Sequence, residues 1–547
     1  MNIEETVKKQ VLINAAEHNG ISQPKSVLGR IMAGNPELRE RLFEIKNMID
    51  SYTMQVNRMS PKEQKKAIES FGGYEKKPVK KEKKVLPNLE RSRAFVVRFA
   101  PNPDGALHIG NIRVAILNDE YRKKYNGKFI LRFDDTDPKV KTPEKHFYAW
   151  IKEDLKWLDI KWDKEVISSK RLPIYYKYAQ ELVDKGKAYV CTCGDEWKKL
   201  VLKSKPCQCR LIDAKEQKNR WKKMLTHEYK EGEAVLRIKT DLELKNPAVR
   251  DWPAMRIVDH PKHPLVRKHL WPLYNFSSAI DDHLLNITNI LRGQEHSTNE
   301  SKQRFIYQYF NWNYPFTSIV GRFSVSDMVM SKSLIRKGVE KGQFGGWDDL
   351  NLATIRSLQR RGFKPQAIRK LIMDIGLKPN DITVSMENLS AYNRKLIDAE
   401  ARRYFFILDP KEITIDKTKV RSITLQHHPI KKLGSRKISV SKTLYIERED
   451  FKKYKGLEIR LKDLFNIRLN EKSKYAGKEV KNMPKIHWLS KPNVEVKIAM
   501  SKSTIKGYAE PSIKKSKPGQ MIQLESFGFC RVEKISAKSV SLVFAHT

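Results

Sequence analysis

The chain has 547 residues and carries 107 Lys and Arg against 64 Asp and Glu, a formal net charge of +43. At roughly 100–200 residues per domain, this length corresponds to several domains. Hydrophobic residues make up 40% of the chain and aromatic residues 9%, which is enough for packed cores and excludes a disordered chain. Because so large a cation excess destabilises a compact protein, we expect a polyanionic partner such as nucleic acid, with a generally basic proteome as the alternative.

The N-terminal segment and the cysteines indicate the compartment. Residues 1–10 contain two glutamates and two lysines and no apolar segment, so we do not expect a signal peptide. No stretch approaches the ~18 uncharged apolar residues of a membrane span. Four of the five cysteines lie between positions 191 and 209, which favours a metal site in a reducing compartment over disulfides. We therefore expect a soluble, cytoplasmic protein.

The first seventy or so residues have the apolar spacing of helices. Apolar positions recur three and four residues apart at Val7, Val11, Leu12, Ala15, Leu38, Leu42, Ile45 and Ile49. Residues 75–90 (EKKPVKKEKKVLPNLE) have no such periodicity, and seven of their first ten positions are lysine or proline. We interpret this segment as a solvated linker.

A strand–helix–strand pattern follows the linker. Residues 94–99 (AFVVRF) predict a strand, residues 101–105 a turn, residues 107–125 a helix and residues 128–133 a second strand. Two strands joined by a helix of this length predict a parallel β–α–β unit.

The remaining segments differ in character. Residues 185–270 combine cysteines, charged runs and short strand candidates, which we interpret as an insertion, and residues 271–323 return to an α/β pattern. Residues 347–404 are rich in helical periodicity. From about Arg403 the chain consists of short alternating segments that predict β-barrels, and residues 401–547 hold 33 Lys and Arg against 14 Asp and Glu. A basic, all-β region is suited to binding nucleic acid.

The most informative motif is RFAPNPDGALHIGN, residues 98–111. Two prolines set a rigid turn directly after a strand, and Gly105 permits the close approach of a ligand. His108 and Gly110 then fall in the first turn of the next helix, whose free N–H groups attract phosphate. In isolation, a histidine in H-x-G-N would be interpreted as a core or capping residue. In this strand–turn–helix context, the motif predicts a phosphate site.

This motif resembles the HIGH motif of class I aminoacyl-tRNA synthetases, in the form of their glutamyl and glutaminyl members, with Asn111 in place of the last histidine. Residues 329–333 (VMSKS) resemble the KMSKS loop, with Val329 in place of its first lysine. Residues 132–138 (RFDDTDP) and 271–296 resemble two further segments of glutamyl-tRNA synthetases. The basic, strand-rich C-terminal region is similar to the archaeal and eukaryotic type of that subfamily.

The resemblance implies an α/β fold: a class I Rossmann-like catalytic domain with an acceptor-stem insertion, a helical connector and C-terminal all-β anticodon-binding barrels. The implied domains are an N-terminal helical appendage (1–74), a charged linker (75–90), the two halves of the catalytic domain (91–185 and 271–345), the insertion (186–270), the connector (346–402) and the barrels (403–547).

The resemblance also implies the roles of individual residues. His108 and Lys332 are the expected catalytic residues, because they would stabilise charge on the phosphates of ATP. The expected ATP-binding residues are Gly105, His108, Gly110, Asn111, Ser331 and Lys332. The expected glutamate-binding residues are Arg98, Asn102, Asp134, Tyr274 and Arg292.

Within the expected glutamate site, Arg98 and Arg292 would face the side-chain carboxylate. Glutamate and glutamine have the same shape, and an amide leaves a buried guanidinium partly unpaired, so Arg292 favours glutamate. Asp134 would hold the α-ammonium group, and Tyr274 would close the pocket.

The clustered cysteines form two C-x-C pairs separated by thirteen residues: Cys191 with Cys193, and Cys207 with Cys209. Four thiolates in two close pairs fit a tetrahedral structural zinc, and members of the subfamily often carry such a knuckle in this insertion. The alternative is four reduced cysteines in a small subdomain. Cys530 stands alone, and we expect a buried apolar residue.

The implied reaction has two steps. L-glutamate and ATP, as its Mg²⁺ complex, form glutamyl-adenylate, and glutamate then passes to the 3′-terminal adenosine of tRNA(Glu), with tRNA(Gln) left open as a second acceptor. We expect a monomer that does not bind membranes. Three alternatives stay open: a glutaminyl-tRNA synthetase, a synthetase-like protein that has lost catalysis, and a nucleotidyltransferase of the same superfamily that acts on small molecules.

Overall fold

Four helices build the N-terminal part of the chain: α1 (Ile3–Glu17), α2 (Pro24–Gly34), α3 (Leu42–Arg58) and α4 (Pro61–Ser70). The computed structural model describes residues 3–17, 20–34, 41–71, 86–91, 94–416 and 420–547 and divides into two units, Met1–Lys83 and Lys84–Thr547. Leu38 and residues 75–85 of the expected linker lie outside the described residues.

The helical periodicity of this first unit correctly predicted most of its core. The buried side chains include Val7, Val11, Leu12, Ala15, Ile45 and Ile49. Leu42 is an exception, because it is the first residue of α3 and is 47% exposed. The apolar stripe of α3 therefore begins one turn later than its spacing predicted.

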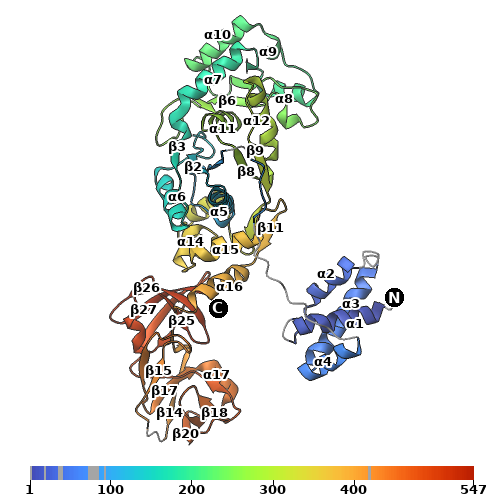
Figure 1. Cartoon of the computed structure of the whole chain (residues 1–547). Coiled ribbons are helices and arrows are strands. Elements are labelled where there is room, and N and C mark those ends of the chain that lie inside the picture. The colour runs from blue at the N-terminus through green and yellow to red at the C-terminus, as the bar shows by residue number, and fades with distance from the viewer. Residues whose placement is uncertain (1–2, 18–19, 35–40, 72–85, 92–93, 417–419) are drawn as a thin grey trace. The chain divides into compact units, whose positions relative to one another are not determined.

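A parallel sheet organises the second unit. Strands β1 (Val96–Phe99), β2 (Lys128–Phe133) and β3 (Lys164–Ile167) pair in parallel. Helix α5 (Ile109–Lys124) connects β1 to β2 and packs on both strands (Figure 1). The predicted β–α–β unit is therefore confirmed.

The sheet continues beyond the free edge of β1. The Thr288 N–H donates to the Val96 carbonyl at 3.0 Å, which places β8 (Asn289–Gly293) beside β1, and β8 pairs in parallel with β9 (Phe316–Val320). Helix α6 (Lys145–Trp157) joins the hydrophobic core with α5. Because the strands are parallel, their carboxyl ends meet at one edge of the layer, where α/β folds bind ligands.

The segment between β3 and β8 forms a separate antiparallel sheet with its own core. The strands, in spatial order, are β4 (Ala188–Cys191), β5 (Val235–Ile238), β6 (Pro253–Ile257) and β7 (Leu270–Pro272). The accompanying helices are α7 (Leu172–Asp184), α8 (Gly194–Leu202), α9 (Gln208–Leu211), α10 (Ala214–Leu225), α11 (Tyr274–Leu284) and α12 (Ser297–Tyr309). Trp221, Trp252 and Trp271 are buried in this core.

Helices predominate between the sheet and the C-terminal region. They are α13 (Lys332–Glu340), α14 (Ile355–Arg360), α15 (Pro365–Ile375) and α16 (Met386–Ile397), with the short parallel pair β10 (Phe323–Val325) and β11 (Ile382–Val384) beside them. Ile355, Leu358 and Ile368 are buried in the same core as α5.

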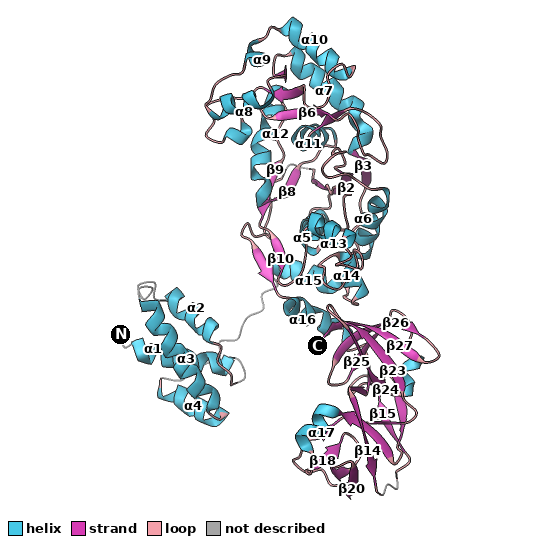
Figure 2. Cartoon of the chain, turned by 180° about the vertical axis from the view of Figure 1, so that it is seen from behind, coloured by secondary structure: helices cyan, strands magenta, loops and turns pink. Residues whose placement is uncertain are grey.

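The C-terminal region is built almost entirely of strands (Figure 2). One seven-stranded sheet has the order β12 (Arg402–Tyr404), β25 (Met521–Leu524), β26 (Gly528–Ile535), β27 (Ser539–His546), β23 (Val494–Ala499), β24 (Thr504–Ala509) and β13 (Phe406–Leu408). The other has the order β21 (Lys485–Ile486), β18 (Glu458–Leu461), β19 (Asn466–Arg468), β20 (Lys472–Gly477), β14 (Pro410–Ile415), β17 (Thr443–Glu447) and β22 (Leu489–Ser490). The hairpin β15 (Ser422–Gln426) and β16 (Ser435–Ser439) and helix α17 (Arg448–Tyr454) complete the region.

Each barrel-like sheet encloses an apolar cluster of its own, as the alternating segments predicted. Cys530 is fully buried in one of these clusters, as expected for an apolar residue. Among the described residues, no helix is both long and apolar enough to cross a membrane.

A buried arginine fastens the β15–β16 hairpin to the first of these sheets. Arg436 in β16 is 4% exposed, and its guanidinium forms ion pairs with Glu510 at 2.8 Å and with Glu525 at 3.0 Å. Burial opposes ionisation of Glu525, but hydrogen bonds from His487 and Lys462 lower its pKa to about 2. For Glu510, burial outweighs the nearby Arg436 guanidinium and raises the pKa, so this carboxylate depends on Arg436 for its charge.

We predict that Arg436→Met destabilises this region, because it leaves the buried Glu510 carboxylate without its ion-pair partner, while Glu525 keeps Lys462 and His487. Loss of one partner of a buried pair costs about 3–5 kcal/mol. Hydrogen exchange of the amides of β16 and β25 in the full chain measures the change in opening free energy. Arg448→Met is the matched control, since Arg448 pairs with Asp409 on the surface, and it should leave exchange in these strands unchanged. Equal effects of the two substitutions would contradict the assignment.

Candidate active site

A cavity of about 620 Å³ opens at the carboxyl edge of the parallel sheet. It is lined by the ends of β1, β2 and β8 and by the first residues of α5, α11 and α13. Nine of the residues expected to bind ATP or glutamate line it: Arg98, Asn102, His108, Gly110, Asn111, Asp134, Tyr274, Arg292 and Lys332. Segments far apart in sequence thus converge on one cavity, as the motifs predicted.

Two residues expected to bind ATP do not line the cavity. A Cβ atom on Gly105 would lie 2.5 Å from the indole of Trp347, so the group that approaches this glycine closely is a side chain of the protein. Ser331 is the N-cap of α13, and its hydroxyl accepts the Leu334 N–H at 3.5 Å. The structure therefore gives both residues roles in positioning Lys332 and its helix.

The position of His108 differs from the sequence prediction. It is the N-cap of α5 and not a residue of the first turn. Its Nδ1 accepts the Asn111 N–H at 3.4 Å, while the Asn111 side-chain oxygen accepts the His108 N–H at 3.3 Å. With Nδ1 acting as an acceptor, the proton of the neutral ring is on Nε2. Burial and the nearby charge of Lys332 lower the pKa of His108 to about 3, so the ring is a neutral donor at physiological pH.

Lys332 is held by the turn that precedes His108. Its Nζ donates to the Asp104 carboxylate at 2.7 Å and to the Asn102 carbonyl at 2.9 Å. One turn further along α13, Arg336 donates to the Asp104 carbonyl at 2.6 Å and pairs with Glu144. The VMSKS segment is thus anchored to the PNPDG turn, and the ammonium group lies at the cavity wall.

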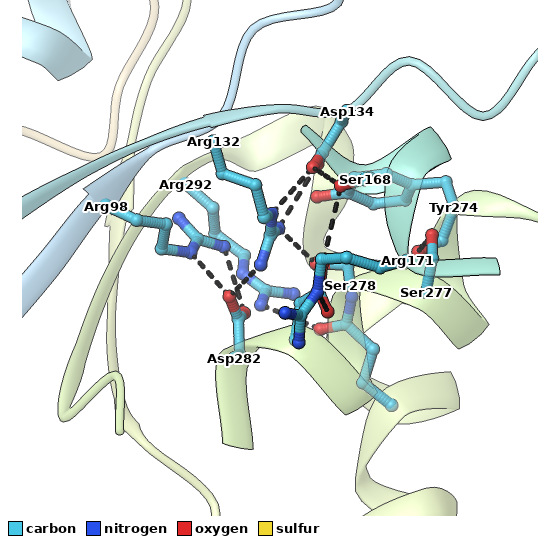
Figure 3. A network of polar contacts seen from close by, with 12 residues as sticks. Arg98, Arg132, Asp134, Ser168, Arg171, Tyr274, Ser277, Ser278, Asp282 and Arg292 are labelled. Atoms are coloured by element: carbon cyan, nitrogen blue, oxygen red, sulfur yellow. Dashed lines mark hydrogen bonds and ion pairs between the residues drawn. The ribbon is translucent and has the colours of Figure 1, made fainter. Parts of the chain in front are cut away.

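A network of buried ion pairs forms the opposite end of the cavity (Figure 3). Arg98 donates to both oxygens of Asp282, at 3.1 and 3.3 Å. Arg132 donates to Asp282 at 2.6 Å, to Asp134 at 2.6 Å and to the Ser278 hydroxyl at 2.9 Å. Burial disfavours the charge of Asp282, but Arg98 and Arg132 outweigh it and lower its pKa. Asp282 therefore stays ionised, whereas burial raises the pKa of Asp134 despite its bond from Arg132.

The other expected glutamate-binding residues surround this network. Asp134 also accepts the Ser168 hydroxyl at 3.4 Å, and Tyr274 begins α11 with 37% of its surface exposed. The Asn102 amide donates to the Lys141 carbonyl at 3.0 Å, beside the bond that its own carbonyl accepts from Lys332. Arg292, in β8, is 5% exposed.

The sequence motifs contained two important residues whose role they did not reveal. Arg132 and Asp282 lie inside the segments 132–138 and 271–296 but were not expected to be site residues. Asp282 joins Arg98 and Arg132, which come from strands far away in sequence. The only signal in the sequence for Asp282 was an acidic residue on the buried side of α11. Helical periodicity does not identify the arginines with which it pairs.

The four clustered cysteines also come together. The Sγ atoms of Cys193 and Cys209 lie 3.3 Å apart, and those of Cys191 and Cys207 lie 4.0 Å apart. The sulfurs of Cys191, Cys193 and Cys207 lie within 4.8 Å of one another. Cys209 also accepts hydrogen bonds from the Thr192 N–H and from Arg220, each at 3.4 Å. All five cysteines of the chain are free thiols in the structure.

Comparisons with known proteins identify the family of the chain. The family model described as tRNA synthetases class I (E and Q), catalytic domain, matches residues 94–399, and two models of the anti-codon binding domain match residues 401–487 and 485–533. The fold is that of a class I tRNA synthetase. Within that class, the chain belongs to the E and Q family.

Curated relatives match over their whole length. The chain is 48% identical to proteins named glutamate–tRNA ligase from Pyrococcus furiosus and from Pyrococcus abyssi, in each case covering 100% of both chains. Among solved structures, a glutamate tRNA ligase from Elizabethkingia meningosepticum in complex with its amino acid has a TM-score of 0.40 and 19% identity. That alignment covers 56% of this chain and 70% of the other.

We predict that His108 remains neutral across the physiological range. Its folded pKa of about 3 lies below the ordinary 6.5, so protonation favours the unfolded chain. Its contribution to stability is present above pH 6.5 and is lost as the pH falls toward 3. Nitrogen NMR of histidine-labelled protein, with His108→Asn used to assign the signal, should show an Nε2-protonated ring that does not titrate between pH 5 and 8. A transition near pH 6.5 would contradict this.

Proposed function

We propose that the chain is a glutamate–tRNA ligase that forms glutamyl-adenylate from L-glutamate and ATP and transfers glutamate to the 3′-terminal adenosine of tRNA(Glu). Full-length relatives that carry this name support the proposal. The charge balance at the buried end of the cavity is the observation that supports glutamate as the amino acid.

Four guanidinium groups face three carboxylates at that end of the cavity, and one of these pairs is Arg171 with Asp281 at 2.7 Å. Arg98 and Arg132 share Asp282 and Asp134, whereas Arg292 forms no ion pair in the described part of the chain. One positive charge is therefore left over. The side-chain carboxylate of glutamate would neutralise this charge, and the amide of glutamine would not, so a buried site of this composition selects the acid.

The other end of the cavity suits the phosphates of ATP. The start of α5 offers N–H groups, His108 a neutral Nε2–H donor and Lys332 an ammonium group. In the first step, an α-carboxylate oxygen attacks the α-phosphorus and the bond to pyrophosphate breaks. No protein nucleophile is required, because these donors stabilise the charge that develops on the phosphates. Mg²⁺ would bind together with ATP as part of the substrate.

In the second step, a ribose hydroxyl of the tRNA attacks the glutamyl carbonyl and AMP leaves. We assign catalysis to residues 91–185 and 271–345, binding of the tRNA acceptor stem to the insertion 186–270, and binding of the anticodon to residues 403–547. We assign residues 346–402 as the connector, 1–74 as a helical appendage and 75–90 as a linker. The cation excess of the C-terminal region supports this assignment, since it attracts a polyphosphate. We propose a monomer, with tRNA(Gln) as a second acceptor.

Aminoacylation assays test this function. With labelled glutamate, the purified chain should charge tRNA(Glu) and tRNA(Gln), whereas labelled glutamine should not be attached to either. Lys332→Ala should slow adenylate formation at least about 100-fold and leave tRNA binding unchanged, because a lost transition-state donor costs 10²–10³-fold. Lys337→Ala, on the exposed side of the same helix, is the control. Charging with glutamine, or no adenylation with tRNA present, would overturn the proposal.

We also propose that Cys191, Cys193, Cys207 and Cys209 bind one structural zinc ion. Zn–S bonds of about 2.3 Å in a tetrahedron place the sulfurs about 3.8 Å apart, close to the separations of 3.3 and 4.0 Å in the two cross-pairs. The ion would cross-link β4 with the start of α9. Arg220, which donates to Cys209, would partly balance the charge of four thiolates.

Metal analysis of the purified chain should find about one zinc per molecule, bound by the four thiolates. Cys193→Ser should lower the zinc content and the thermal stability of the insertion, because a hydroxyl is a poor zinc ligand. Cys530→Ser is the control, since Cys530 is fully buried in a C-terminal core, and it should retain the metal. A chain without zinc whose stability is insensitive to chelators would support the alternative of four reduced cysteines.

A further inference from the structure

Arg292 differs from Arg98 and Arg132, the other arginines at this end of the cavity, in having only neutral partners. Its Nη2 donates to the Gln303 side-chain oxygen at 3.0 Å and to the Tyr314 hydroxyl at 2.9 Å. Its Nη1 reaches the His296 carbonyl at 3.5 Å, and its Nε has no partner among the described residues. The guanidinium is thus oriented by dipoles, and its charge is not neutralised.

Gln303 is the centre of this arrangement. It lies in α12, is 1% exposed, and its oxygen accepts from both Arg292 and Tyr314. Because a guanidinium can only donate, the amide must present its oxygen to Arg292. The amide nitrogen is buried and has no partner within the described part of the chain. The position therefore retains a neutral amide although one of its hydrogen-bonding groups is unsatisfied.

The carboxylates nearest to this pair in sequence are engaged or exposed. Glu300 forms an ion pair with Arg304 at 2.7 Å, and the Arg304 guanidinium lies 4.4 Å from the centre of the Tyr314 ring. Glu295 lines the cavity as an exposed residue. Arg98 and Arg132, by contrast, each bind Asp282 directly. Whether Arg292 keeps its free charge thus depends on the residue at position 303.

We propose that Gln303 is a specificity-determining positioning residue. Its neutral amide fixes the Arg292 guanidinium without neutralising it, so that the charge is reserved for an anionic substrate side chain. The inference rests on the proposed glutamate activation and names a residue that controls its selectivity. A carboxylate at this position, which has almost the same size as the amide, would pair with Arg292 and neutralise its charge.

The test compares three variants in tRNA-dependent pyrophosphate exchange, with glutamate and with glutamine as substrates. Gln303→Glu should lower kcat/KM for glutamate at least about 100-fold and maintain or raise that for glutamine, with KM for ATP unchanged. Gln303→Met keeps the site neutral but removes the acceptor, so it should raise KM for glutamate and retain the preference for the acid. Gln308→Glu adds the same charge on an exposed position of α12 and should behave as wild type.

The pH dependence of Gln303→Glu separates charge from folding. Protonation of the introduced carboxyl restores a neutral group, so lowering the pH should partly recover the preference for glutamate in this variant only. Equal losses for both amino acids in the Glu and Met variants, without recovery at low pH, would show a purely structural role and overturn the inference. Failure of the wild type to activate glutamate with tRNA present would instead overturn the proposed function.

Discussion

An unequal number of buried charges is the constraint on which the rest of the cavity depends. Arg98 and Arg132 are ionised in the core only because Asp282 and Asp134 lie within hydrogen-bonding distance. A third cation, Arg292, lies in the same region and has only neutral hydrogen-bond partners. Such an arrangement costs stability in the empty protein, because a buried charge without a counter-ion is poorly solvated. The protein thereby maintains a site whose best partner is an anion of matching shape.

The fold explains how this arrangement is held. Arg98, Arg132 and Arg292 come from the strands β1, β2 and β8, and Asp282 of helix α11 pairs with the first two of them. Strands hold side chains more rigidly than loops do, so the distances within the network are set before substrate arrives. The phosphate end is built differently, from the N-terminal ends of α5 and α13, where backbone N–H groups are available.

Sequence patterns predicted the parallel unit, the strand-rich C-terminal region and most of the cavity wall. They succeeded where a local signal exists: alternation for C-terminal strands such as β23, helical spacing for α1, and a continuous motif for residues 98–111. They failed where a residue's role depends on a distant partner. Gly105 was expected to admit a ligand, but Trp347 occupies that space. His108 was expected one position further into α5, because spacing does not show that Asn111 bonds back to it. Asp282 and Gln303 have roles that only the packing of α11 and α12 reveals.

The two ends of the cavity treat their cations in opposite ways, and this difference has a consequence for binding. Lys332 already has a carboxylate partner in Asp104, so an incoming phosphate competes with an existing ion pair and gains only the difference between the two interactions. Arg292 has no carboxylate partner within the described part of the chain, so under the proposed function a substrate carboxylate would not compete with an existing ion pair. Discrimination is therefore strongest at the amino-acid end, where glutamate and its amide must be told apart. At the nucleotide end, the ion pair with Asp104 holds Lys332 in place, and under the proposed function a phosphate group of ATP would have to replace Asp104.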